Sequence, residues 1–225
     1  MTDDLLASRR HTIITLLIVA GVTAVGMQSA PAADGAAATP DSRVWLYLGL
    51  IAVQFAWVRY IYVGMRARGR SLREFFGRRW TPAVVAGDLL FAALGYFVAN
   101  RAGEWLTVIL GGASANTAFL LPRSLAERML WVAVSCTAGL CEETVYRGYL
   151  QQQLGRLTGY LPLGVILQAV AFGVSHGYQG YASMLTTGAY GLTLGVLVWW
   201  RGNLRSAALA HAATDIIGGL MSTPP

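Results

Sequence analysis

Two adjacent glutamates, Glu142 and Glu143, lie inside an apolar stretch, and Arg147 follows one helical turn later. A carboxylate at membrane depth is costly, so an ionisable residue in such a segment is a functional-site hypothesis by default. On a helix Glu143 and Arg147 are four residues apart and share a face, which allows an ion pair. Glu142 is turned by about 100° from that face. We therefore interpret Glu143 as the carboxylate neutralised by Arg147 and Glu142 as the one free for another function, although the two could exchange roles.

Three further polar residues lie in the apolar segments that follow, namely His176, His211 and Asp215. With a rise of about 1.5 Å per residue, Glu142, His176 and His211 lie about 20, 24 and 11 Å from the nearest arginine-rich boundary, so they can meet. The spacing predicts one polar cluster built by three helices. Taken singly, either histidine could instead bond a neighbouring helix, Arg147 could extend to the interface, and Asp215 could cap a terminal turn.

The composition indicates the elements that must position these residues. The chain has 225 residues, of which 55% are hydrophobic and 12% charged, and its mean hydropathy is +0.50. Soluble domains carry about 25% charged residues. We therefore predict an all-α, polytopic membrane helix bundle in a lipid bilayer. The net charge of +6 comes from arginine alone and is better explained by membrane topology than by nucleic-acid binding. Cys136 and Cys141 are expected to be small buried residues, and Cys141 could line the site.

About 20 apolar residues are needed to cross the hydrocarbon core. Seven candidate spans result, at residues 12–28, 44–63, 82–100, 127–150, 161–178, 181–200 and 204–221. The fifth and seventh are short or interrupted by polar groups, as in helices that line a polar cavity. Residues 66–80 form a basic loop in which Leu72, Phe75 and Phe76 could build an interfacial helix.

The arginines predict the orientation of these spans. Twelve lie at one set of span ends and four at the other, which puts the N-terminus in the cytoplasm and the C-terminus outside. His11 is expected at the edge of the first span, and Trp105, Trp131, Trp199 and Trp200 at the membrane interfaces. The first span also resembles a signal peptide, so its cleavage is an alternative. The lysine-free chain with this N-terminus suggests a bacterial inner membrane.

Three patterns occur in order on separate apolar segments: Glu-Glu-x-x-x-Arg, Phe-x-x-x-His and His-x-x-x-Asp. Together they resemble the CPBP family of intramembrane proteases, which includes the CAAX prenyl endopeptidase and bacteriocin-processing or abortive-infection membrane proteases. The resemblance implies a catalytic four-helix core in residues 126–225, with residues 1–125 supplying further transmembrane helices and the basic loop. It implies the catalytic residues Glu142, Glu143, Arg147, His176, His211 and Asp215, and substrate contact by Phe172. The prenyl-CAAX enzymes have Asn where this chain has Asp215, and an ionised Asp cannot donate a hydrogen bond.

The resemblance implies an endopeptidase acting on a membrane-associated peptide or protein. We expect Glu142 and His176 to activate water, and His211 with Asp215 to stabilise the oxyanion. Zinc held by Glu142, His176 and His211 is an alternative, against which the nearby Arg147 argues. The same polar residues could also serve a proton-coupled transporter, a haem protein with His176 and His211 as axial ligands, or a non-catalytic immunity or partner protein on the same scaffold. The sequence leaves the substrate open, including whether it is prenylated.

Overall fold

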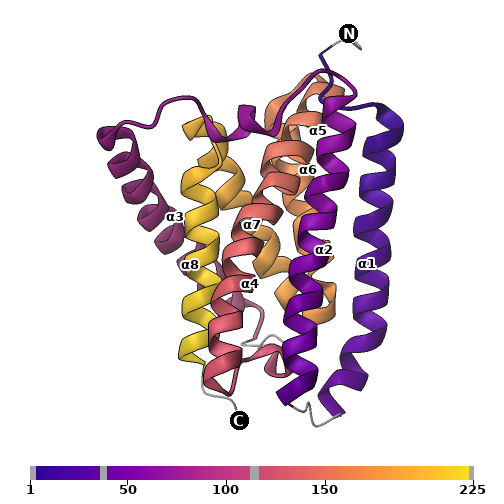
Figure 1. Ribbon diagram of the computed structural model, residues 1–225, viewed down its shortest axis with the longest axis vertical. Coiled ribbons are helices and arrows are strands. Elements are labelled where there is room, and N and C mark those ends of the chain that lie inside the picture. The colour runs from indigo at the N-terminus through magenta and orange to yellow at the C-terminus, as the bar shows by residue number, and fades with distance from the viewer. Residues whose placement is uncertain (1–3, 36–39, 112–116, 223–225) are drawn as a thin grey trace.

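The computed structural model describes residues 4–35, 40–111 and 117–222, and the regular structure of these residues is helical (Figure 1). The longer helices are α1 (Arg9–Gly35), α2 (Pro40–Arg66), α3 (Pro82–Ile109), α4 (Leu125–Glu143), α6 (Leu161–Ser175), α7 (Tyr181–Arg201) and α8 (Arg205–Met221). The shorter elements are η1 (Leu72–Phe76), η2 (Ala118–Leu120), the π-helix η3 (Thr144–Leu150), α5 (Gln151–Thr158) and η4 (Gly177–Gln179). The predicted all-α membrane bundle is confirmed.

The helices correspond to the seven predicted spans, because α4, η3 and α5 follow one another without a break. Within the described part of the chain, four segments are long and apolar enough to cross a membrane by themselves, at Arg9–Gln28, Arg43–Arg66, Pro82–Ile109 and Tyr181–Arg201. The third predicted span was too short, since α3 continues past Asn100 to Ile109. The fifth was too long: α6 ends at Ser175, and η4 follows it.

The two ends of the described chain lie at opposite ends of the bundle (Figure 1). At the N-terminal end, Asp4 forms ion pairs with Arg70 at 2.8 Å and with Arg156 at 2.5 Å. Buried Gln153 accepts a hydrogen bond from the backbone N–H of Leu6 at 2.7 Å. These contacts join the N-terminal segment, the basic loop and α5, so three arginine-rich parts of the sequence meet at one end of the bundle.

The basic loop contributes to the interior. Its helix η1 begins with a capping box formed by Ser71 and Glu74. Phe75 is buried, and its carbonyl oxygen accepts a hydrogen bond from the backbone N–H of Leu204 at 2.8 Å. A Cβ atom on Gly148 would lie 2.6 Å from the Phe75 ring. The predicted helix is therefore present, but its central aromatic residue packs against η3.

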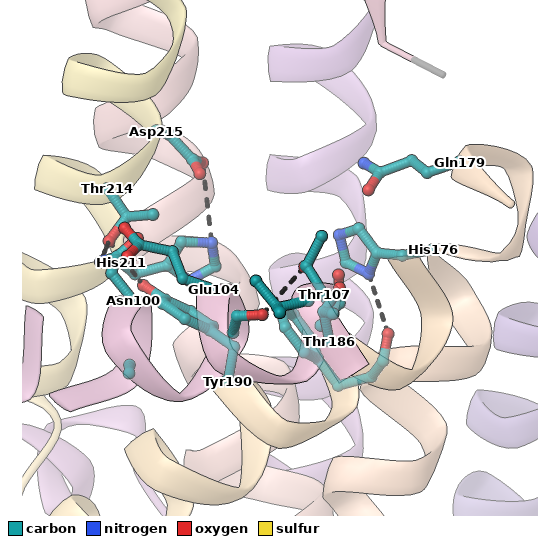
Figure 2. A pocket seen from close by; sticks show the side chains of 15 residues that line it. Asn100, Glu104, Thr107, His176, Gln179, Thr186, Tyr190, His211, Thr214 and Asp215 are labelled. Carbon is teal, nitrogen blue, oxygen red and sulfur yellow. Dashed lines mark hydrogen bonds and ion pairs between the residues drawn. The ribbon is translucent and has the colours of Figure 1, made fainter. Parts of the chain in front are cut away.

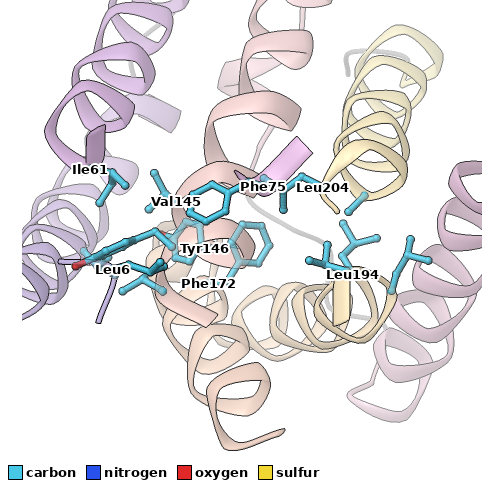
Figure 3. Packing of buried hydrophobic residues seen from close by; sticks show 14 of the residues in the cluster. Leu6, Ile61, Phe75, Val145, Tyr146, Phe172, Leu194 and Leu204 are labelled. Atoms are coloured by element: carbon cyan, nitrogen blue, oxygen red, sulfur yellow. The ribbon is translucent and has the colours of Figure 1, made fainter. Parts of the chain in front are cut away.

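The hydrophobic core surrounds the segment that follows the paired glutamates. Tyr146, Tyr149 and Leu150 of η3 are at most 1% exposed. They belong to a cluster that also contains Phe172 of α6 and Leu194 of α7 (Figure 3). Large apolar side chains on the outer faces of the helices are exposed, which is the pattern expected of a bundle surrounded by lipid. Arg147, which also lies in η3, is thus held by residues of the hydrophobic core.

One prediction about an individual residue is wrong, and it concerns Cys136. The indole N–H of Trp131 donates to the backbone carbonyl of Asp215 at 2.8 Å, so it joins α4 to α8. Cys136 is exposed, because it lies on the outward face of α4, whereas Cys141 is buried as expected. Trp105 and Trp200 are each 69% exposed, and His11 stacks on Tyr60 near the start of α1.

Candidate active site

Close helix packing brings the paired glutamates and the second histidine together. A Cβ atom on Gly139 of α4 would lie only 2.6 Å from the backbone oxygen of Ala208 and 2.8 Å from the nitrogen of Ala212, both on α8. Small residues of this kind let two membrane helices approach closely. The absence of a side chain at Gly139 therefore places Glu143, one turn later, against His211.

Glu143 is the centre of the cluster. Its side chain is 0% exposed, and its Oε1 atom lies 2.9 Å from Nη1 of Arg147 and 2.8 Å from Nδ1 of His211. The pair with Arg147 is the one that the spacing predicted. The contact with His211 was not predicted, because it joins two helices that are far apart in the sequence. An ionised carboxylate only accepts hydrogen bonds, so His211 donates from Nδ1.

Arg147 lies in the π-helix that begins directly after Glu143. The backbone N–H of Gln151 bonds to the carbonyl of Tyr146, five residues earlier, which is the π-helical pattern. The Arg147 guanidinium is 0% exposed and lies 4.2 Å from the centre of the Phe172 ring. The ring face and the carboxylate together surround the buried cation. Phe172 is itself 1% exposed, so most of its surface contacts the protein.

Glu142 points away from this pair, as its position on the helix predicted. Its side chain is 22% exposed, and its Oε2 atom lies 4.0 Å from Nε2 of His211. Asp215 approaches the same histidine nitrogen, at 3.6 Å, and its side chain is 35% exposed. Nε2 of His211 therefore faces two partly accessible carboxylates, while Nδ1 is held by a fully buried one.

His176 lies just beyond the end of α6. Its Nδ1 atom lies 2.8 Å from the backbone carbonyl of Phe172 and 3.2 Å from Oγ of Ser175. Because a carbonyl oxygen can only accept, Nδ1 carries the proton, and Nε2 of the neutral ring is an acceptor. The turn after α6 thus fixes both the orientation and the tautomer of this histidine.

Two cavities adjoin these side chains. One of about 530 Å³ lies between α3, α7 and α8, and one of about 390 Å³ lies between α2, α4 and α8. His176, His211 and Asp215 line both cavities, and Glu142 lines the smaller one. Figure 2 shows His211 and Asp215 on one side of the larger cavity and His176 on the other. The residues expected to be catalytic are therefore brought together, with the accessible ones around shared open space.

Sequence reasoning missed the polar residues that other helices add to the wall. Asn100 of α3 donates to Oγ1 of Thr214 at 2.9 Å, and the Tyr190 hydroxyl lies 3.2 Å from the same oxygen. Asp88, also on α3, lies outside this wall, where it is buried and pairs with Arg205 at 2.6 Å. The available signal was the presence of Asp88 and Asn100 within an otherwise apolar span.

The arrangement of donors does not fit the zinc site that the sequence left open. Across residues 4–35, 40–111 and 117–222, no group of three or more His, Cys, Asp or Glu side chains is placed to hold a metal ion. Arg147 adds a positive charge beside the glutamates.

Comparison with known families adds one match. Residues 124–217 match the family model described as Rce1-like, type II CAAX prenyl endopeptidase Rce1-like. None of the curated proteins and none of the solved structures compared with the chain matches it. The matched segment begins at the N-cap of α4 and ends within α8, so it contains the paired glutamates, both histidines of the cluster and Asp215.

Proposed function

We propose that this chain, which belongs to the CPBP family of CAAX-type membrane proteases through residues 124–217, hydrolyses a peptide bond with water activated by Glu142 and His176. The family makes it an integral membrane endopeptidase whose substrate is a membrane-associated protein or peptide. The observation that carries the catalytic assignment is the division between the two glutamates. Glu143 is fully buried between Arg147 and His211, whereas Glu142 is accessible from a cavity that His176 also lines.

In the proposed reaction, Glu142 removes a proton from water while Nε2 of His176 accepts its second hydrogen bond. The water oxygen attacks the carbonyl carbon of the scissile bond and forms a tetrahedral oxyanion. When the carbon–nitrogen bond breaks, Glu142 returns the proton to the leaving nitrogen. A carboxylate in a partly desolvated site is suited to both transfers, because apolar surroundings reduce the cost of protonating it.

We assign the stabilisation of the oxyanion to His211. Its Nδ1 atom is held by Glu143 at 2.8 Å, so its Nε2–H would be fixed in direction and aimed at the side where Glu142 and Asp215 lie. A fixed donor aimed at the developing charge lowers the barrier without reorganisation during the reaction. Asp215, at 3.6 Å, would balance the charge of the doubly protonated ring.

The test is cleavage of membrane-anchored peptides by purified chain in liposomes. We expect Glu142→Gln to abolish turnover, because an amide cannot take the proton from water. Glu74→Gln is the matched control, since Gln replaces Glu in a capping box at the far end of the bundle. Near-normal turnover of Glu142→Gln would contradict the assignment of the base. Turnover that requires an added divalent metal would contradict the proposed hydrolysis by side chains alone.

A further inference from the structure

A third cavity lies beside Glu142 and adjoins the smaller of the two described above, with which it shares Glu142, His176 and Tyr178. It has a volume of about 150 Å³ and is largely apolar. Glu142, Ser175 and His176 form the end nearest the proposed reaction. The apolar part of its wall includes Val22 of α1, Val53 and Trp57 of α2, and Cys141 of α4.

The walls of this cavity come from two parts of the chain. Helix α1 packs against α6 and η4, whereas α2 packs against α4, and the cavity lies between these two pairs. The reactive end belongs to the segment that matches the family, residues 124–217, while the α1 and α2 walls lie outside it. The shape of the cavity is therefore set by residues that carry none of the catalytic patterns.

The size and polarity of the cavity restrict what it can hold. An apolar cavity of about 150 Å³ accommodates a group the size of benzene. Two polar groups of its wall are engaged: Gln54 accepts a hydrogen bond from Thr137 at 2.6 Å, and Ser175 donates to the Phe172 carbonyl at 2.7 Å. The indole nitrogen of Trp57 and the hydroxyl of Tyr146 are buried in the same wall without a hydrogen-bond partner, and polar atoms make up only a small part of the lining. An aliphatic or single-ring side chain fits these conditions, whereas a prenyl chain of several isoprene units is too large.

We propose that this cavity binds the side chain of the substrate residue next to the scissile bond, and that it selects medium-sized apolar residues such as Leu, Met or Phe. The inference rests on the proposed function, because the cavity ends at Glu142. A side chain inserted between α1 and α2 would bring its own backbone to the carboxylate that activates water. Val22 and Val53, at the outer wall, are 50% and 56% exposed, so the side chain would point from the backbone at Glu142 outward toward the lipid-facing surface.

The test uses membrane-anchored peptides that carry Ala, Leu, Phe or farnesylated Cys on either side of the cleaved bond. We expect the wild-type chain to prefer Leu or Phe over Ala by about tenfold or more in kcat/KM, as one or more buried methylenes allow. Val53→Phe narrows the cavity and should reduce that preference by a similar factor. Trp57→Ala widens it and should shift the preference toward Phe. Phe55→Ala, which removes a lipid-facing ring from the same helix, should leave the ratios unchanged.

Unchanged ratios in Val53→Phe and Trp57→Ala, with cleavage continuing, would overturn the subsite and leave the proposed function intact. A preference for farnesylated Cys that neither variant alters would also overturn it. Absence of cleavage by the wild type would overturn the proposed function instead.

A second measurement does not depend on turnover or on pocket variants. In a Cys136→Ala, Glu142→Gln chain, Cys141 in the cavity wall is the remaining thiol. A peptide with Leu at the selected position should slow its modification by methyl methanethiosulfonate several-fold, and the matching Ala peptide should not. Equal rates with both peptides would show that the side chain binds elsewhere.

Discussion

The Oε1 atom of Glu143 lies 2.8 Å from Nδ1 of His211 and links two helices whose contacting residues are 68 positions apart. The same oxygen is 2.9 Å from Arg147. A buried carboxylate that contacts both Arg147 and His211 is a structural part of the site. Its removal should therefore affect stability differently from removal of Glu142.

We expect Glu143→Gln to lower the free energy of unfolding by about 3–5 kcal/mol, because it leaves the buried Arg147 guanidinium without its counter-charge. Thermal unfolding of both proteins in detergent measures this loss of stability. Glu142→Gln should cost much less, since its side chain is 22% exposed. Equal destabilisation by the two substitutions would contradict the separate roles of the glutamates.

Replacing both partners of the buried pair separates stability from activity. Glu143→Gln combined with Arg147→Met should recover much of the stability lost by Glu143→Gln alone, because no uncompensated charge remains. The double variant should nevertheless stay inactive, since His211 keeps no anionic partner at Nδ1. Recovery of turnover together with stability would show that the Glu143–His211 contact does not position the histidine.

Close approach of α4 and α8 at Gly139 makes a further prediction. Gly139→Ala places a methyl group within 2.6 Å of the Ala208 carbonyl, so the helices must move apart. We expect a loss of about 1–3 kcal/mol in stability and a larger loss of turnover than stability alone explains. Gly49→Ala is the control, because nothing lies within 4 Å of the added atom there. Normal turnover of Gly139→Ala would indicate that the spacing of α4 and α8 is not critical.

Trp131 supplies a more distant support for Asp215. Trp131→Phe removes the hydrogen bond to the Asp215 carbonyl and should cost about 0.5–1.5 kcal/mol of stability. Because this bond positions the α8 turn that carries Asp215, kcat should fall several-fold with little change in KM. Trp105→Phe replaces an exposed indole and serves as the control. A change confined to KM would point to a role of Trp131 in substrate binding instead.

Removal of metal ions gives a direct prediction about chemistry. Since the described side chains gather no set of three ligands, we expect turnover to survive exhaustive chelation. The measurement is residual cleavage after dialysis against a chelator, together with metal analysis of the same sample. Loss of activity that added zinc restores would contradict this expectation.

The sequence alone was sufficient to predict the helical bundle and the contact between residues four positions apart on one helix. Hydropathy located the spans, and the spacing of four residues predicted the contact of Glu143 with Arg147. It could not predict the partner of His211, because interhelical contacts depend on small residues such as Gly139 rather than on local periodicity. The sequence did not predict the larger cavity, for a related reason. Asn100 lies on a helix without a recognised pattern, and only tertiary packing brings it to Thr214.

The π-helical turns at Thr144–Leu150 affect how this membrane protein is assembled. Such turns are rare in isolation and persist where surrounding contacts favour them. In an ordinary α-helical register, every residue after this segment would be rotated by about 100° for each residue of shift. The register of this segment therefore decides which face α5 turns toward the rest of the bundle, and with it the contact of Gln153 with the backbone of Leu6.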